Sequence, residues 1–128
     1  MRTHWCDADP AGIVYFANHF SFVEQAEEEL FRAHGGSRQE LLQQHQVWMP
    51  RVEAFSKYMR PIKIGATIRV RLSPHLKGLK TVRYEFEILD DASSETLAEG
   101  YVTVVCVDAL RFKATPIPDA IRTFIDAK

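Results

Sequence analysis

An acidic turn near the start of the chain carries the residue types that acyl transfer needs. Asp9 is followed by Pro10, which fixes the backbone, and by Gly12, which permits a positive φ angle or a close approach. A helical pattern begins soon afterwards, and a helix N-terminus presents unpaired N–H groups and about half a positive charge. Such groups stabilise an oxyanion, while a nearby carboxylate attacks a carbonyl carbon or activates water. On local features alone, however, an Asp N-cap in a tight turn is the more common meaning of this pattern.

The elements that must position this turn begin with one long helix. Apolar residues recur every three or four positions from about 18 to 34, which predicts a helix with one buried face. That predicted face consists of Phe20, Val23, Ala26, Leu30 and Ala33. Glycines at 35 and 36 end the helix, and a Ser37–Glu40 capping box predicts a second, short helix through about Gln44.

The second half of the chain shows the period-two alternation of antiparallel strands. Strands are predicted at about 49–59, 68–72, 82–88 and 101–107, with a turn at 90–94. A short C-terminal helix follows Pro118, with Ala120, Ile121 and Phe124 as its apolar side. Residues 1–6 resemble the tail of a first strand that is cut short, because Met1 stands only eight residues before Asp9. The order predicts a single α+β domain over residues 1–128, with the helix on one face of the sheet.

Composition excludes several classes of function. The net charge of −1 lacks the basic excess of nucleic-acid-binding proteins, and no apolar run approaches the roughly 20 residues of a membrane helix. No secretory segment opens the chain, so a reduced, cytoplasmic protein is expected. Cys6 and Cys106 are too few for a disulfide framework and are expected to be packed as small apolar residues. The histidines show no metal-ligand spacing, so neither a metal nor another cofactor is predicted.

The segment from Asp7 to Asn18 resembles the signature of hotdog-fold acyl-CoA thioesterases. It is most similar to the 4-hydroxybenzoyl-CoA thioesterase type, which includes the bacterial thioesterases associated with the Tol-Pal cluster. Tyr58-x-x-Pro61-x-x-x-Gly65 is similar to the second strand and turn of this family, and the later strands and Pro116-Ile117-Pro118 also fit. The resemblance covers nearly the whole chain except the front of the first strand, and it is specific for the family but not for the substrate.

This resemblance implies a hotdog fold, in which a curved antiparallel sheet of about five strands wraps around one long helix. It also implies a homodimer with active sites at the interface, often paired into a homotetramer. The catalytic aspartate of the family falls on Asp9, and the backbone N–H that polarises the thioester carbonyl falls on Phe16. Many relatives carry histidine at the position of Phe16, so this chain is more similar to the aromatic-acyl type. An aspartate is a weak base at neutral pH, which favours nucleophilic attack by Asp9 over activation of water.

Further candidates surround this pair, each with a plain structural alternative. Glu24 lies on the long helix, where a different hotdog subfamily has a catalytic acid, and it is a reserve candidate beside a helix-stabilising role. Tyr15 and Asn18 are expected to shape the pocket mouth or to fix the loop, and His19 could line the acyl pocket, although a surface or half-buried histidine is the more common case. Trp48, Met49 and Pro50 could form a wall of the acyl pocket from the partner subunit, or could equally be packed in the core. Basic residues that could meet the phosphates of CoA, or simply solvate turns, are Lys77, Lys80, Arg111 and Lys113.

The predicted activity is hydrolysis of an acyl-CoA to a free acid and CoA, with a 4-hydroxybenzoyl-like aromatic acyl group favoured. One alternative is a short or medium aliphatic acyl-CoA, or an acyl group on a carrier protein. An alternative of another class is a hotdog protein that binds an acyl thioester or a partner protein without turnover. Neither nucleic acid nor a membrane is expected as a partner.

Overall fold

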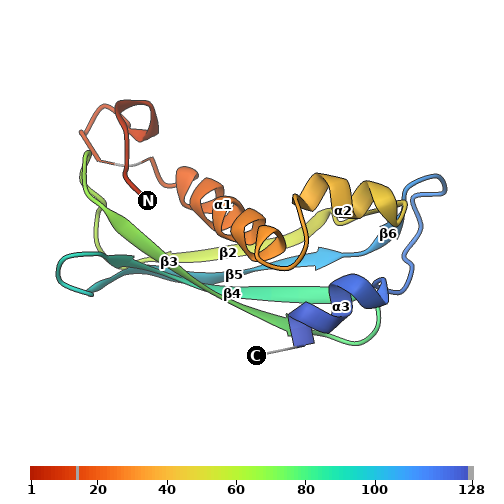
Figure 1. Ribbon diagram of the computed structural model, residues 1–128. Coiled ribbons are helices and arrows are strands. Elements are labelled where there is room, and N and C mark those ends of the chain that lie inside the picture. The colour runs from red at the N-terminus through yellow and green to blue at the C-terminus, as the bar shows by residue number, and fades with distance from the viewer. Residues whose placement is uncertain (14, 127–128) are drawn as a thin grey trace.

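A long helix lies along one face of an antiparallel sheet in the computed structural model, which describes residues 1–13 and 15–126. Figure 1 shows this helix, α1 (Asn18–Arg32), above a twisted sheet of four strands. The strands follow the order β2 (Arg51–Tyr58), β5 (Thr96–Val105), β4 (Thr81–Asp90) and β3 (Ile68–Leu76). The predicted α+β layout is therefore confirmed, while Val14, a member of the signature segment, lies outside the described residues.

Smaller elements gather at one end of the sheet. The two-stranded pair β1 (Val47–Trp48) and β6 (Val107–Asp108) lies beside α2 (Arg38–Gln44), and α3 (Asp119–Asp126) packs against β3. The Ser37 side chain accepts a hydrogen bond from the Glu40 N–H at 3.1 Å, which confirms the predicted start of α2. Figure 1 places these elements away from the N-terminal segment, at the opposite end of α1.

The N-terminal residues contribute less strand than the sequence predicts. Arg2 forms an isolated antiparallel bridge with Thr67, and the Met1 carbonyl accepts a hydrogen bond from the Ile68 N–H at 2.8 Å. The chain then turns into a 3-10 helix, η1 (Trp5–Asp7). The predicted strand tail over residues 1–6 is thus confirmed only at its first residues, because the approach to the acidic turn requires a change of direction.

The buried face of α1 differs from the predicted one. Its buried residues are His19, Phe22, Val23, Glu27 and Phe31, whereas Ala33 is exposed and Phe20, Ala26 and Leu30 are half-buried. Four of the five buried residues follow a strict four-residue spacing, which is one stripe of a helix. The prediction is confirmed for Val23, and Phe20 and Leu30 pack partly buried against the core, but it left out His19, Phe22, Glu27 and Phe31.

The sheet supplies the other side of the core. Val82, Tyr84, Phe86 and Ile88 of β4 are all buried toward α1, as their alternation predicts. Strand β5 begins at Thr96 rather than at about residue 101, and its register places Arg51 opposite Val104 and Tyr58 opposite Ala98. Cys106 is buried as expected, and burial raises the pKa of its thiol to about 11. Cys6 is exposed, which corrects the prediction that both cysteines are packed.

Strand β2 forms one edge of the sheet, and its side chains are largely exposed. Val52 and Phe55 are 60% and 50% exposed, in a strand whose only sheet neighbour among the described residues is β5. Strand edges with unpaired N–H and C=O groups are sites of association.

Among the described residues, no helix is long and apolar enough to cross a membrane.

Candidate active site

The acidic turn is a closed loop held by its own backbone. The Asp9 N–H donates to the Ile13 carbonyl at 2.9 Å, and the Gly12 N–H donates to the Asp9 carbonyl at 3.0 Å. Gly12 has a φ angle of 79°, so the predicted need for glycine is confirmed. The Ala11 N–H donates to Oδ1 of Asp9 at 2.8 Å, which fixes the half-buried carboxylate in one orientation. Asp9 therefore caps its own turn rather than the helix, which begins nine residues later.

Two contacts join this turn to the start of α1. The Asp7 carbonyl accepts hydrogen bonds from the Tyr15 N–H at 2.7 Å and from Nδ2 of Asn18 at 2.9 Å. The Asp7 carboxylate accepts from the His4 N–H at 2.8 Å. Asp7 and Asn18 thus hold the loop together, and Asn18 does so with the side chain that was predicted to shape the pocket.

A cavity of about 310 Å³ opens beside Asp9, where the turn, the start of α1 and the segment after β2 meet. Its lining residues are Asp9, Ile13, Phe16, His19, Tyr58, Met59, Arg60, Pro61 and Ile62. The structure therefore brings together three of the predicted site residues, namely Asp9, Phe16 and His19. Tyr15 is 43% exposed next to this group, with its ring centroid 4.6 Å from that of Phe16.

The backbone at Phe16 suits an oxyanion. Within residues 1–13 and 15–126, the N–H groups of Phe16 and Ala17 have no hydrogen-bond acceptor. The Phe16 carbonyl, by contrast, accepts from the Tyr58 hydroxyl at 3.0 Å and from the His19 N–H at 3.3 Å. Backbone donors just before a helix that meet no acceptor among the described residues, near a held carboxylate, are an arrangement that stabilises negative charge on a carbonyl oxygen.

His19 is the buried polar residue of this cavity. Its side chain is 3% exposed, and its ring meets that of Tyr58 edge-on, with centroids 4.8 Å apart. Its Nδ1 atom is buried and finds no partner in the described part of the chain. Burial lowers the pKa of His19 below its usual value, which favours the neutral form of the ring.

The second set of predicted pocket residues lies elsewhere in the chain. Trp48, Met49 and Pro50 line a separate depression of about 580 Å³, together with residues of α1 and α2 and the exposed Phe112. This depression and the Asp9 cavity share no lining residue. One subunit alone therefore does not bring Trp48, Met49 and Pro50 to Asp9.

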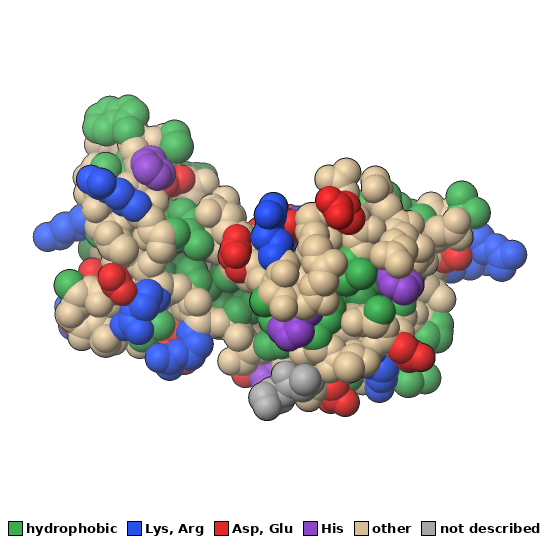
Figure 2. Space-filling view, viewed as in Figure 1, with side chains coloured by type: hydrophobic (Ala, Val, Ile, Leu, Met, Phe, Trp, Pro, Cys, Tyr) green, Lys and Arg blue, Asp and Glu red, His purple; other side chains and the backbone are tan. Residues whose placement is uncertain are grey.

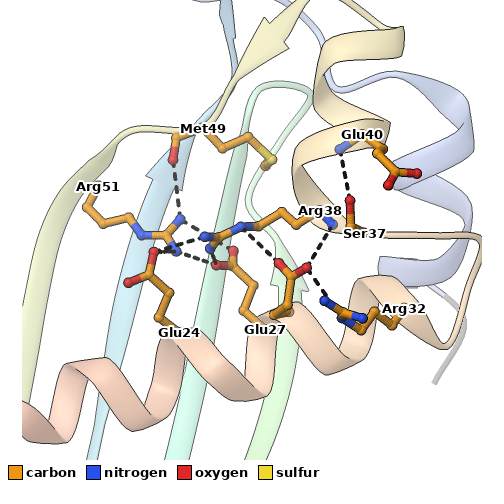
Figure 3. Close-up of polar contacts among 9 residues, drawn as sticks. Glu24, Glu27, Arg32, Ser37, Arg38, Glu40, Met49 and Arg51 are labelled. Atoms are coloured by element: carbon orange, nitrogen blue, oxygen red, sulfur yellow. Dashed lines mark hydrogen bonds and ion pairs between the residues drawn. The ribbon is translucent and has the colours of Figure 1, made fainter.

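Glu24 lines that second depression and belongs to a cluster of charges. Figure 3 shows the guanidinium groups of Arg38 and Arg51 between the carboxylates of Glu24 and Glu27. Glu27 is 2% exposed and forms ion pairs with both arginines, while the Glu24 side chain is 55% exposed and 3.0 Å from Arg38. Burial, followed by the negative charge of Glu27, raises the pKa of the neighbouring Tyr84. Glu24 forms ion pairs with arginines and does not line the Asp9 cavity. Its position therefore favours a helix-stabilising role over that of a catalytic acid.

The predicted CoA-binding lysines and arginines lie at the other end of the sheet from Asp9. The Cys106 N–H donates to the Lys80 carbonyl at 2.8 Å, and the Asp108 N–H donates to the Lys113 carbonyl at 2.8 Å. These groups adjoin the Arg51 end of β2, since Val104 pairs with both Arg51 and Val82. Lys77 and Arg111 belong to the same two turns. The Asp9 cavity adjoins the Tyr58 end of that strand.

The predicted site residues did not include the two polar residues that the segment at the end of β2 brings to the cavity. Tyr58 contributes its ring and its hydroxyl, and Arg60 provides a cation, which is 2.7 Å from the Glu95 carboxylate. The spacing Tyr58-x-x-Pro61 was noticed only as a mark of a strand and turn. The position of Tyr58 at the end of a predicted strand was the signal that could have placed it at the site. Figure 2 shows hydrophobic side chains in the hollow between the N-terminal segment and the rest of the molecule. The described residues contain no group of three or more side chains suited to a metal ion.

Comparisons with known proteins agree with this architecture. The acyl-CoA thioester hydrolase YbgC of Escherichia coli O157:H7 is 28% identical over 94% of this chain and 89% of its own length. The 1,4-dihydroxy-2-naphthoyl-CoA hydrolase of Nostoc punctiforme is 27% identical over 94% of this chain and 80% of its own length.

Solved structures show the same fold. A 1,4-dihydroxy-2-naphthoyl-CoA thioesterase from Synechocystis superposes with a TM-score of 0.91 at 24% identity, over 98% of this chain and 91% of that one. A gentisyl-coenzyme A thioesterase superposes with a TM-score of 0.83 at 23% identity, over 95% of this chain and 96% of that one. The hotdog prediction is thereby confirmed. The family model of the thioesterase-like superfamily matches residues 1–125, and the chain belongs to that superfamily.

Proposed function

We propose that this chain hydrolyses acyl-CoA thioesters in the cavity beside Asp9, with an aromatic acyl group favoured. One observation carries the proposal: the fixed carboxylate of Asp9 and Phe16, whose N–H meets no acceptor among the described residues, line one cavity in a member of the thioesterase-like superfamily. The acyl-CoA thioesters named for the curated relatives agree with the reaction class.

The contacts of Asp9 support attack on the thioester carbonyl carbon. The Ala11 N–H occupies Oδ1, and in the described residues Oδ2 has no hydrogen-bond donor. Attack by the carboxylate forms a mixed anhydride as the C–S bond breaks and the CoA thiolate leaves, later taking a proton from solvent. Water then cleaves the anhydride, releasing the free acid and restoring Asp9. The Phe16 N–H stabilises the oxyanion in both steps, an interaction worth about 10²–10³ in rate.

The walls of the cavity favour a flat acyl group. Phe16, His19 and Tyr58 present three rings, with Phe16 and Tyr58 edge-to-face at 6.1 Å. A volume of about 310 Å³ is at the small end of ligand pockets, so the cavity suits the acyl group while the nucleotide of CoA stays outside. Aliphatic acyl-CoAs and carrier-protein thioesters are the alternative substrates that a test must include.

A second copy of the chain explains the separation of the predicted site residues. If β2 pairs antiparallel with β2 of another subunit about its centre, the Arg51 end of one strand lies beside the Tyr58 end of the other. Trp48, Met49 and Pro50 of the partner subunit would then flank the Asp9 cavity, and the turns that carry Lys77, Lys80, Arg111 and Lys113 would approach it as well. The exposed edge of β2, with Val52 and Phe55, supports this homodimer. A homotetramer of two such dimers stays a prediction.

Release of free thiol from a panel of acyl-CoAs tests the proposal. The panel contains benzoyl-, 4-hydroxybenzoyl-, 1,4-dihydroxy-2-naphthoyl-, butyryl- and octanoyl-CoA, together with one acyl-carrier-protein thioester. Wild type should cleave the aromatic esters best, and Asp9→Asn should lower kcat at least 10³-fold, because the amide is neither a nucleophile nor a base.

Asp7→Asn is the matched control, since Asp7 is a nearby acid whose carboxylate contacts only the His4 N–H among the described residues. It should retain most of the activity. Absence of thiol release from every thioester would contradict the enzyme. Full activity of Asp9→Asn would contradict the assigned residue but not the reaction class.

A further inference from the structure

Burial divides the lining of the Asp9 cavity into a floor and a rim. His19 and Ile62 are 3% and 2% exposed, whereas Phe16, Tyr58 and Met59 are 44–56% exposed. CoA carries a large charged nucleotide that must remain in water. The acyl group is the part of the substrate that can reach the floor, so its end far from the thioester meets His19.

The floor contains one unsatisfied polar atom. Nδ1 of His19 is buried without a hydrogen-bond partner in residues 1–13 and 15–126, although an unpaired buried polar atom is unfavourable. The hydroxyl of Tyr58, whose ring contacts the His19 ring, donates to the Phe16 carbonyl. A phenylalanine in place of His19 would suit the aromatic surroundings and would bury no unpaired polar atom. The presence of a histidine at the floor of the cavity therefore indicates a ligand that forms a hydrogen bond with Nδ1.

The charges of the cavity limit what that ligand group can be. The charged side chains of the lining are Asp9 and Arg60, and Arg60 lies at the rim in an ion pair with Glu95. No cation of the lining stands at the floor to balance a carboxylate. A neutral imidazole offers one donor and one acceptor, which suits a hydroxyl group.

We propose that His19 is the specificity-determining residue of this site, and that its imidazole forms a hydrogen bond with a hydroxyl group at the distal end of the acyl group. This inference rests on the proposed function, because it takes the cavity to be the acyl site. His19 binds the substrate, and Asp9 with the Phe16 N–H carries out the reaction.

The test compares two substrates of nearly equal size, 4-hydroxybenzoyl-CoA and 4-methylbenzoyl-CoA. Wild type should prefer the hydroxyl over the methyl ester by about 10- to 100-fold in kcat/KM, because the methyl group leaves Nδ1 unpaired. In His19→Phe this ratio should fall to about one, mainly through loss of the hydroxylated substrate. His19→Asn retains a polar group near the place of Nδ1 and should restore part of the preference. The matched control is His34→Phe, since His34 lies beyond the other end of α1 and stacks on Phe124.

The outcomes separate this inference from the proposed function. Equal turnover of both esters by wild type would overturn the role of His19 and leave the thioesterase site intact. An equal loss for both esters in His19→Phe would also overturn it, because that result marks a structural role. If wild type cleaves no acyl-CoA at all, the proposed function fails and this inference fails with it. Thermal unfolding of each variant shows whether the fold is kept.

Discussion

Tyr58 connects the two sides of the proposed active site. It is the last residue of β2, yet its hydroxyl reaches the Phe16 carbonyl and its ring meets His19. The peptide group that follows the proposed oxyanion donor is therefore oriented by a residue 42 positions away in sequence. Tyr58 acts as a positioning residue, because its hydroxyl is occupied by the backbone.

Tyr58→Phe tests this arrangement. Loss of the hydroxyl leaves the Phe16 carbonyl with only the His19 N–H, so the donor segment loses part of its alignment. We expect kcat to fall about 5- to 10-fold with little change in KM, which corresponds to about 1 kcal/mol for one hydrogen bond. Steady-state kinetics on the best acyl-CoA measures the split. Tyr101→Phe, on the outer face of the sheet, is the control, and an unchanged kcat in Tyr58→Phe would refute the positioning role.

The sequence brought together part of the cavity and missed most of its walls. Asp9 and Phe16 line one cavity because a short, local segment carries both, and their roles in the reaction stay predictions. Tyr58 and Arg60 were missed, since their approach to Asp9 depends on how β2 lies against α1. Trp48, Met49 and Pro50 were placed at the acyl group through an expected partner subunit, and the single chain keeps them apart from Asp9.

At the scale of elements, buried charge joins α1, α2 and β2. Arg38 is the first residue of α2 and Arg51 the first of β2, and both contact Glu27 in the middle of α1. This is also why the helix face could not be predicted. A glutamate enters a core only when distant residues supply its counter-charges, and hydrophobic periodicity does not contain that information.

Removing the buried charge should therefore destabilise the fold. Glu27→Gln leaves two partly buried guanidinium groups without their main partner, and we expect the free energy of unfolding to fall by about 3 kcal/mol. Glu24→Gln should change it by less than about 1 kcal/mol, because Glu24 is largely exposed. Urea unfolding followed by tryptophan fluorescence measures both. Glu24→Gln should also keep its thioesterase activity, and a loss of activity in a folded protein would return this residue to the list of catalytic acids.

At the scale of the whole molecule, the proposed homodimer depends on the exposed edge of β2. We expect the wild-type chain to sediment as a dimer or larger assembly, and Val52→Lys to produce monomers by placing a charge on that edge. Thioesterase activity should fall with the loss of assembly, at least 10-fold, because in the proposed homodimer the partner subunit completes the site. Thr123→Lys, on the exposed side of α3, should change neither, because α3 packs against β3 at the opposite edge of the sheet. A fully active monomer would contradict the shared site.

The strand order also sets when the acyl cavity can form during folding. Strands β3 and β4 are neighbours in sequence and pair locally, whereas β2 pairs with β5, as in Arg51 with Val104. Long-range pairing is slow, because a large loop must close before its contacts form. During synthesis on the ribosome, β2 cannot pair in the sheet until the whole β3–β4 hairpin and then β5 have been made. The cavity needs Tyr58 at the end of β2, so we expect it to form only after β3, β4 and β5 have assembled. None of these three strands carries a proposed reacting group.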